Sequence, residues 1–266
     1  MTLLQLTVIA VVQGITEFLP ISSSGHLRMI PLLTGWPDQG LVIDIAVHAG
    51  TLLAVLVYLW RDVLGMLAGL VRIRSGMADP GVRLIVHLAV ATVPLAAAGY
   101  ALTEFLGTAW RSSLAVIGWA TIGFGLLLYL SDRIGLTVRR IEHLRLSSAF
   151  AIGLAQILAL FPGASRAGVT VTAARLLGFE RRDAARFSML MSIPAIAAAG
   201  GFAYRELAES GDVALQSDAV LAAGLAFVAA LIAMAAMMSW LRRASFTPFV
   251  IYRLALGGGL LAFVYL

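Results

Sequence analysis

One polar stretch decides the fold of this chain, and it reads Gln13-Gly-Ile-Thr-Glu17-Phe-Leu-Pro20-Ile-Ser22-Ser23-Ser24-Gly25-His26-Leu27. Pro20 cannot continue a helix, so the apolar helix expected from residue 3 should end near the middle of a membrane. The three serines are good N-caps for a second short helix, which we expect to run to about residue 33. Two half-helices joined by a polar elbow predict a re-entrant hairpin, which is tolerated at membrane depth only where protein or water surrounds it.

The composition places the whole chain in a membrane. It has 266 residues, of which 61% are hydrophobic and 12% are charged, and its mean hydropathy is +0.95. The apolar runs are long and continuous and lack the alternation of an outer-membrane barrel, so the spanning elements are expected to be helices. We therefore predict an all-α polytopic membrane protein with one domain over residues 1–266.

Two residue types are absent, and each absence excludes a class of chemistry. Without cysteine there is no disulfide framework, thiolate metal site or cysteine nucleophile. All 19 basic residues are arginine, which excludes a lysine Schiff base and a P-loop. The net charge of +5 has two interpretations, an arginine excess in cytoplasmic loops and an anionic substrate. We expect no nucleic-acid partner.

The rest of the chain divides into further apolar segments. We expect full-length spans over residues 41–60, 84–102, 114–130, 187–204, 219–241 and 249–266, and a second broken hairpin over residues 148–161 and 165–177. Arginine gathers in three connections, over residues 61–83, 132–145 and 242–243. If these connections are cytoplasmic, both termini lie outside, and the two hairpins enter the membrane from opposite faces.

A shift of 143 residues relates the two hairpins. It pairs identical residues at four positions: Gln13 with Gln156, Phe18 with Phe161, Ser22 with Ser165, and Gly25 with Gly168. Because these identities coincide with the two helix breaks, they predict two repeats of inverted topology, over residues 1–131 and 148–266. Each repeat would hold one re-entrant hairpin and three transmembrane helices, with the site at the membrane midplane.

The first elbow offers an acid and a neutral oxygen on one helix face. Gln13 and Glu17 are four residues apart, so their side chains lie one turn apart on the same side of the helix. Mg²⁺ and Ca²⁺ both take oxygen ligands, and these two residues are therefore candidate metal ligands. The alternative is that Glu17 is protonated and only hydrogen-bonded.

The serines that follow are candidates for binding and attacking phosphate. Unpaired amides at a helix N-terminus attract phosphate, and Gly25 lets the backbone come close, which makes Ser22, Ser24 and Gly25 candidate binding residues. The Ser23 hydroxyl could attack phosphorus if a base were near, and His26 is three residues away. The alternative is that the serines only bond to backbone or allow close helix packing.

The second elbow supplies a cation. Arg166 lies at the expected start of a helix, where a guanidinium can grip phosphate with two hydrogen bonds and neutralise charge during phosphoryl transfer. Ser165 and Thr170 would add hydroxyls, and Gly163 and Gly168 would allow close backbone contact. The alternative is an arginine that reaches to the membrane surface.

Other polar residues in the apolar segments are expected to have structural roles. We expect Arg175 and Arg186 at the membrane interface. His48, His87 and His143 have no assigned function, and structure or solvation is the favoured interpretation for each.

Two stretches of the sequence resemble the signatures of a known family. The stretch over residues 13–27 and Pro162-Gly-Ala-Ser-Arg-Ala-Gly-Val-Thr170 are similar to the two signatures of bacterial undecaprenyl-diphosphate phosphatases of the bacitracin-resistance type, and Asp132-Arg133 and Tyr252-Arg253 extend the similarity. The resemblance implies a multi-pass inner-membrane hydrolase that removes the terminal phosphate from a C55 isoprenyl diphosphate and recycles the lipid carrier for peptidoglycan synthesis. It also implies a divalent cation, Mg²⁺ or Ca²⁺, and a site that opens to the periplasm.

The resemblance assigns roles position by position. It implies that Gln13 and Glu17 bind the metal and provide the acid–base group, and that Ser23 or His26 is the nucleophile. It also implies that Ser165, Arg166 and Thr170 form the diphosphate clamp. Two departures weaken the match. Gln13 stands where many members carry glutamate, which weakens a two-carboxylate metal site, and Ala167 stands where serine is common, which removes one hydroxyl of the clamp.

Two other functions share features of this sequence. A type-2 phosphatidic acid phosphatase needs a lysine-containing first motif and a histidine five residues after its Ser-Arg pair, whereas this chain has no lysine and carries Thr172 at the position in question. A transporter or flippase of a polyprenyl phosphate lipid stays open, because broken helices that meet at the midplane are also transporter architecture. A homodimer is compatible with the sequence.

Overall fold

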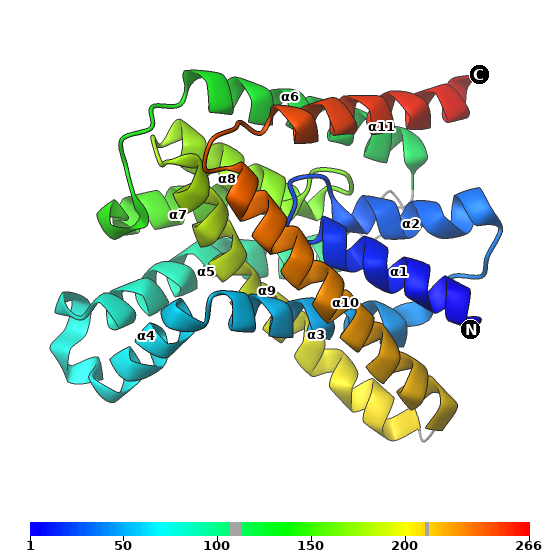
Figure 1. Ribbon diagram of the computed structural model, residues 1–266, viewed down its shortest axis with the longest axis horizontal. Coiled ribbons are helices and arrows are strands. Elements are labelled where there is room, and N and C mark those ends of the chain that lie inside the picture. The colour runs from blue at the N-terminus through cyan, green and yellow to red at the C-terminus, as the bar shows by residue number, and fades with distance from the viewer. Residues whose placement is uncertain (107–112, 211–212) are drawn as a thin grey trace.

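The fold consists of packed helices (Figure 1). The computed structural model describes residues 1–106, 113–210 and 213–266. In that part of the chain the α-helices are α1 Leu3–Thr16, α2 Ser23–Thr34, α3 Gly40–Tyr58, α4 Trp60–Val71, α5 Pro80–Leu106, α6 Leu114–Ile134, α7 Leu146–Gln156, α8 Arg166–Leu176, α9 Arg181–Ser210, α10 Val213–Trp240 and α11 Thr247–Tyr265. Short 3₁₀ turns are η1 Ile73–Ala78, η3 Ile141–His143 and η4 Ile157–Leu160. Helices α1, α2, α6 and α11 run across the view of Figure 1, while α9 and α10 cross them diagonally.

Five of the described helices are long and apolar enough to cross a membrane. They are α3, α6 and α11 together with Pro80–Leu102 of α5 and Leu215–Trp240 of α10, and their mean hydropathies lie between 1.6 and 2.5. The sixth expected span, residues 187–204, lies within the 30-residue helix α9, whose side chains beyond residue 198 are outside the described part. The expectation of an all-helical polytopic membrane protein is confirmed.

Both broken hairpins form where the sequence predicts them. Helix α1 ends at Thr16, four residues before Pro20, and η4 ends just before Pro162-Gly163. We call residues 17–22 the first elbow and residues 161–165 the second elbow. A short helix follows each elbow. Helix α2, with 12 residues, follows the first elbow, and helix α8, with 11 residues, follows the second.

The two new helices begin with the same strained serine. Ser22 has φ 73° and accepts a hydrogen bond from the Gly25 amide, and Ser165 has φ 72° and accepts one from the Gly168 amide. In the described residues these are the only residues other than glycine with positive φ. Such a conformation costs about 1 kcal/mol or more for a residue with a side chain, so tertiary contacts must hold both turns.

Small residues bring the helices around the first hairpin close together. A Cβ at Gly50 of α3 would lie 2.1 Å from the Ala223 carbonyl oxygen of α10, and one at Gly14 of α1 would lie 2.6 Å from the Ala226 oxygen. Close backbone approach of this kind is how membrane helices gain packing energy without a hydrophobic driving force. Helix α10 therefore packs across both α1 and α3, as Figure 1 shows.

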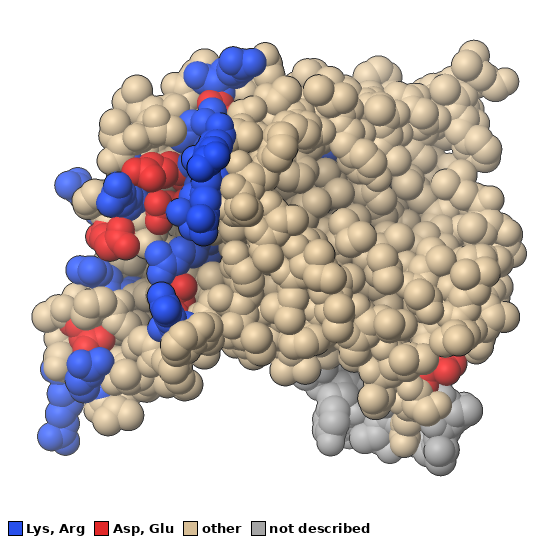
Figure 2. All heavy atoms as spheres, viewed as in Figure 1, with Lys and Arg blue, Asp and Glu red and all other residues tan. Residues whose placement is uncertain are grey.

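On the face of the molecule shown in Figure 2, charged side chains collect at one end. In the view of Figure 2 the arginines and most of the acids lie at the left end, and the remaining surface is almost free of them. The chain termini lie at the opposite end (Figure 1). Arg186, which was expected at the membrane interface, is half-buried and pairs with Asp62.

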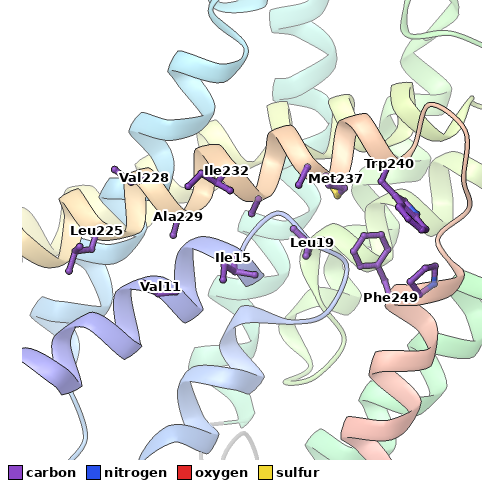
Figure 3. A pocket seen from close by; sticks show the side chains of 13 residues that line it. Val11, Ile15, Leu19, Leu225, Val228, Ala229, Ile232, Met237, Trp240 and Phe249 are labelled. Carbon is purple, nitrogen blue, oxygen red and sulfur yellow. The ribbon is translucent and has the colours of Figure 1, made fainter.

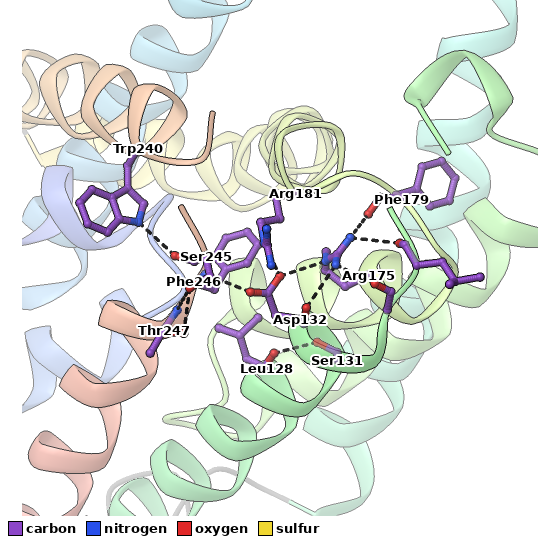
Figure 4. A network of polar contacts seen from close by, with 12 residues as sticks. Leu128, Ser131, Asp132, Arg175, Phe179, Arg181, Trp240, Ser245, Phe246 and Thr247 are labelled. Atoms are coloured by element: carbon purple, nitrogen blue, oxygen red, sulfur yellow. Dashed lines mark hydrogen bonds and ion pairs between the residues drawn. The ribbon is translucent and has the colours of Figure 1, made fainter. Parts of the chain in front are cut away.

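Arg175, which was expected at the membrane interface, is buried within the protein. It is 1% exposed and donates to the Asp132 carboxylate at 3.1 Å and to backbone carbonyls at the end of α6 (Figure 4). Arg181 and the Phe246 amide also donate to Asp132, at 2.7 and 3.2 Å. The buried cation is tolerated because the opposite charge and the carbonyls replace water around it.

Candidate active site

The structure brings the two elbows together through an ion pair. Arg166 Nη2 of α8 lies 3.0 Å from Glu17 Oε1 of the first elbow, although the two residues are 149 positions apart in sequence. Their side chains are only 14% and 7% exposed. A buried carboxylate and guanidinium stabilise the structure only when each is paired, so this contact fixes the two elbows relative to each other.

The second carboxylate oxygen of Glu17 is surrounded by polar groups. Ser23 Oγ donates to Oε2 at 2.7 Å, and Gln13 Nε2 donates to the same oxygen at 3.0 Å. His48 of α3 approaches with its Nε2 at 3.8 Å. The serine proton therefore already points at a carboxylate that can accept it, which is the arrangement a serine nucleophile needs.

Gln13 has one polar atom without a partner. It is fully buried, and its Oε1 accepts no hydrogen bond from any described residue. The described residues contain no group of three histidine, cysteine, aspartate or glutamate side chains that could hold a metal by themselves. One carboxylate and one free amide oxygen suit an ion such as Mg²⁺, which keeps waters and binds substrate phosphates, and they do not suit an all-protein cage.

Both ring nitrogens of His26 are engaged. Nδ1 lies 2.7 Å from the Ser22 carbonyl oxygen, which can only accept, and Nε2 therefore accepts the Tyr252 hydroxyl at 2.6 Å. The two rings are stacked with centroids 5.6 Å apart and an interplanar angle of 8°. His26 thus holds the strained Ser22 in place, and its described hydrogen bonds do not include Ser23.

The predicted phosphate-binding groups line the starts of α2 and α8. The Ser22 and Ser165 hydroxyls are used as helix caps, while Ser24 is exposed and lies 3.5 Å from the Ser22 hydroxyl. Each cap satisfies one first-turn amide and leaves the others pointing out of the helix N-terminus. The structure brings together the two helix starts predicted to bind phosphate.

The three glycines among the predicted binding residues allow close packing. Gly163 has φ +88° and a Cβ there would lie 2.5 Å from the Ile117 carbonyl oxygen. At Gly168 a Cβ would meet Arg253 Nη1 at 2.8 Å, and at Gly25 it would lie 3.3 Å from the Ser22 hydroxyl. A side chain at Gly163 or Gly168 would push an elbow away from its neighbours.

Arg166 is oriented by a serine that the sequence did not single out. Its Nη1 donates to the Ser188 carbonyl of α9 at 3.0 Å. The Ser188 hydroxyl bonds to Thr170 Oγ1 at 2.7 Å, and Thr170 is 1% exposed. Because α9 carries Ser188 among apolar residues without a local motif, only the tertiary structure reveals this support.

Arg253 joins both elbows to α6. This fully buried arginine of α11 donates to the carbonyl oxygens of Pro20, Gly163, Ala164 and Thr121 at 2.9 to 3.1 Å. An arginine in an apolar span marks a functional site by default, so this signal was present in the sequence. The resemblance included Tyr252-Arg253, but neither residue was assigned a role.

An apolar groove of about 740 Å³ begins beside the first elbow (Figure 3). Ile15 and Leu19, each two residues from Glu17 in the sequence, line one part of the groove. The groove continues between α1, α10 and α11, and its walls carry almost no polar atoms. It is lined by Val11, Ile15, Leu19, Leu225, Val228, Ala229, Ile232, Ala233, Ala236, Met237, Trp240, Pro248 and Phe249.

Comparisons with known proteins give a consistent result. A family model described as bacitracin resistance protein BacA matches residues 6–259. The chain is 53% identical to undecaprenyl-diphosphatase 1 of Rhodospirillum rubrum over all of this chain and 96% of that protein. It is 50% and 52% identical to undecaprenyl-diphosphatases of Roseobacter denitrificans and Ruegeria pomeroyi, with full coverage of both chains. The chain therefore belongs to the bacitracin resistance protein BacA family.

Proposed function

We propose that this protein hydrolyses undecaprenyl diphosphate to undecaprenyl phosphate and inorganic phosphate, and so recycles the lipid carrier for cell-wall synthesis. The family and the names of the relatives support this substrate. The observation that carries the chemistry is the chain of contacts from Ser23 to Glu17 to Arg166, which joins a hydroxyl, an acceptor for its proton and a cation.

The first step is attack by the serine. Ser23 Oγ forms a bond to the terminal phosphorus while the bridging P–O bond breaks, and the isoprenyl monophosphate leaves with the bridging oxygen. The serine proton passes to Glu17 Oε2, which is already 2.7 Å from Oγ. Arg166, together with the first-turn amides of α2 and α8, stabilises the charge on the transferred phosphoryl group.

The second step returns the enzyme to its starting state. Glu17 gives up its proton to solvent or to the departing phosphate and then accepts one from a water molecule. That water attacks phosphorus, the P–Oγ bond breaks, and Ser23 regains a proton as inorganic phosphate leaves. The sum is one water consumed and one phosphoric anhydride bond hydrolysed.

Two observations favour Ser23 over His26 as the nucleophile. Ser23 donates directly to Glu17, whereas the His26 Nε2 lone pair accepts the Tyr252 hydroxyl. His26 would have to lose that bond before it could attack. We assign His26 the role of holding Ser22, and with it the start of α2, in position.

A divalent cation fits the same site. Gln13 and Glu17 would hold it through the free amide oxygen and the carboxylate, with the substrate phosphates as further ligands. Bound there, Mg²⁺ or Ca²⁺ would neutralise part of the negative charge of the diphosphate.

The isoprenyl chain of the substrate is assigned to the apolar groove. The groove is lined at one part by Ile15 and Leu19, which are two residues before and after Glu17 in the sequence (Figure 3). Its almost wholly apolar lining matches a hydrocarbon chain.

Two repeats of inverted topology, with the site open to the periplasm, complete the proposal. The shift of 143 residues relates Ser22 to Ser165, which share the same cap and nearly the same φ. The same shift places α1 on α7, α2 on α8, and α3 on α9. The collection of arginines at one end supports a cytoplasmic location for that end.

Replacement of the nucleophile should abolish turnover. We expect Ser23→Ala to lower inorganic phosphate release from undecaprenyl diphosphate by about a thousandfold or more, since the covalent route is lost. A neutral denaturing quench, which preserves both phosphoserine and phosphohistidine, should reveal phosphate on Ser23 by mass spectrometry. The same change at the exposed Ser147 should have no effect. Phosphate on His26, or turnover retained in Ser23→Ala, would contradict the assignment, and no release by the wild type would favour a transporter.

Filling the groove should affect long substrates only. We expect Ala236→Trp to raise the KM for the C55 diphosphate about tenfold, because the indole occupies apolar surface that the lipid would bury. The rate with a short farnesyl diphosphate should stay unchanged. Ala235→Trp, on the neighbouring exposed position outside the groove, is the matched control. Equal effects on both substrates, or none, would place the lipid elsewhere.

The orientation can be mapped with single cysteines because the chain has none of its own. Thr2→Cys and Leu266→Cys should react with an impermeant maleimide on intact spheroplasts. Ser147→Cys and Arg243→Cys should react only after the membrane is permeabilised, since they lie beside and within the arginine-rich connections that we assign to the cytoplasm. Labelling of Arg243→Cys from outside would reverse the proposed orientation.

A further inference from the structure

We propose that a second site, far from the elbows in sequence, binds the headgroup of an anionic phospholipid. The site is a pocket of about 390 Å³ lined by residues 58–62, 182, 186 and 238, which we call the interfacial pocket. These residues come from the junction of α3 with α4, the start of α9 and the end of α10. None of them belongs to either elbow or lines the apolar groove.

The ends of two membrane-spanning helices set the depth of the interfacial pocket. Helix α3 ends at Tyr58 and α10 ends at Trp240, and both have the length and hydropathy of a membrane span. Tyr58 lines the pocket, and so does Met238, two residues before the end of α10. Because a span ends where hydrocarbon gives way to headgroups, the pocket lies at the level of the lipid phosphates.

The interfacial pocket carries more positive than negative charge. Its lining contains three arginines and one acid, which are Arg61, Arg182, Arg186 and Asp62. Asp62 is paired, because it accepts a hydrogen bond from Arg186 Nε at 3.0 Å. The exposed Arg61 and Arg182 form no ion pair with an acidic residue in the described part of the chain. Two guanidinium groups are therefore available to an anion.

The polar groups of the interfacial pocket suit a phosphate. Arg182 and Arg242 both lie near enough to the Tyr58 hydroxyl to act on it electrostatically. A guanidinium can donate two parallel hydrogen bonds to phosphate oxygens, and a tyrosine hydroxyl can donate a third. Basic pockets between membrane helices on the arginine-rich side of a protein are typical binding sites for anionic lipid headgroups.

Apolar side chains next to the interfacial pocket favour a lipid over a free anion. Trp60 lines the pocket and is 53% exposed, and the Arg61 guanidinium lies 5.3 Å from its ring centroid. Val57 and Leu64, which are close in sequence to the lining residues, are also exposed. Tryptophan is enriched at the boundary between hydrocarbon and headgroups. A phosphate held by the arginines would thus have apolar surface beside it for its acyl chains.

A neighbouring hollow of about 340 Å³ does not have the same chemistry. It shares Arg182 and Arg186 with the interfacial pocket, but Glu180 and Asp183 also line it. Glu180 pairs with Arg140 at 3.1 Å. Two carboxylates in that hollow oppose the binding of a phosphate, so we assign the headgroup to the interfacial pocket.

The test measures lipid binding to the full-length protein in detergent by native mass spectrometry. Phosphatidylglycerol and phosphatidylcholine with the same acyl chains are titrated separately. The wild type should bind phosphatidylglycerol at least about twentyfold more tightly, and Arg61→Gln and Arg182→Gln should each weaken that binding about fivefold, which is the contribution expected from one arginine near an anionic lipid. The double variant should bind both lipids about equally.

Two controls separate the interfacial pocket from a general effect of charge. Arg74→Gln removes one charge from an exposed arginine of η1, outside the pocket, and should bind phosphatidylglycerol as the wild type does. Phosphatidylcholine binding and thermal unfolding should be the same in every variant, since neither Arg61 nor Arg182 holds an ion pair.

Three results would overturn the proposal. Equal losses in Arg74→Gln and Arg182→Gln would mean that net charge attracts the lipid, and equal affinity of the wild type for the two lipids would mean that the headgroup is not recognised. Displacement of phosphatidylglycerol by millimolar inorganic phosphate would assign the pocket to a free anion.

Discussion

The hydrogen bonds from the Arg253 guanidinium to the backbone carbonyls of both elbows are the contacts on which the rest of the structure depends. Non-helical backbone at membrane depth leaves carbonyl groups without partners, and each unsatisfied buried carbonyl costs about 1 to 3 kcal/mol. One arginine from α11 donates to Pro20 of the first elbow, to Gly163 and Ala164 of the second, and to α6. Arg253 therefore supplies hydrogen-bond donors to carbonyl oxygens at both helix breaks, and it holds the two breaks side by side. The same two elbows are also joined by the Glu17–Arg166 ion pair.

The site follows from this constraint. Because the elbows are adjacent, the N-termini of α2 and α8 lie near one another. Each of these short helices is capped by a serine with a strained backbone. Partial positive charge from both helix starts and the full charge of Arg166 face the same region as the single carboxylate of Glu17. In the proposed reaction, groups held in this way would need little reorganisation as the phosphoryl group is transferred, and such positioning is the main protein contribution to phosphoryl transfer.

Local chemistry predicted the elbows, and long-range contacts determined the rest. Pro20 and Pro162-Gly163 end helices by backbone geometry alone, so the breaks and the serine caps could be located in the sequence. The buried contacts of Arg175 could not be predicted, because its partners are the Asp132 carboxylate and backbone carbonyls of a distant segment. Ser188 and His48 lie in ordinary helical sequence, and only the packing of α9 and α3 against the elbows brings them to the site.

The most direct measurement is an experimental structure with a methylene-bridged, non-hydrolysable analogue of undecaprenyl diphosphate. Density for the terminal phosphonate is expected between Ser23 and Arg166, in contact with the first-turn amides of both α2 and α8, with the isoprenyl chain leaving past Ile15 and Leu19. A phosphonate bound to only one elbow, or at the arginine-rich end of the molecule, would contradict the claim that the two elbows form a single site.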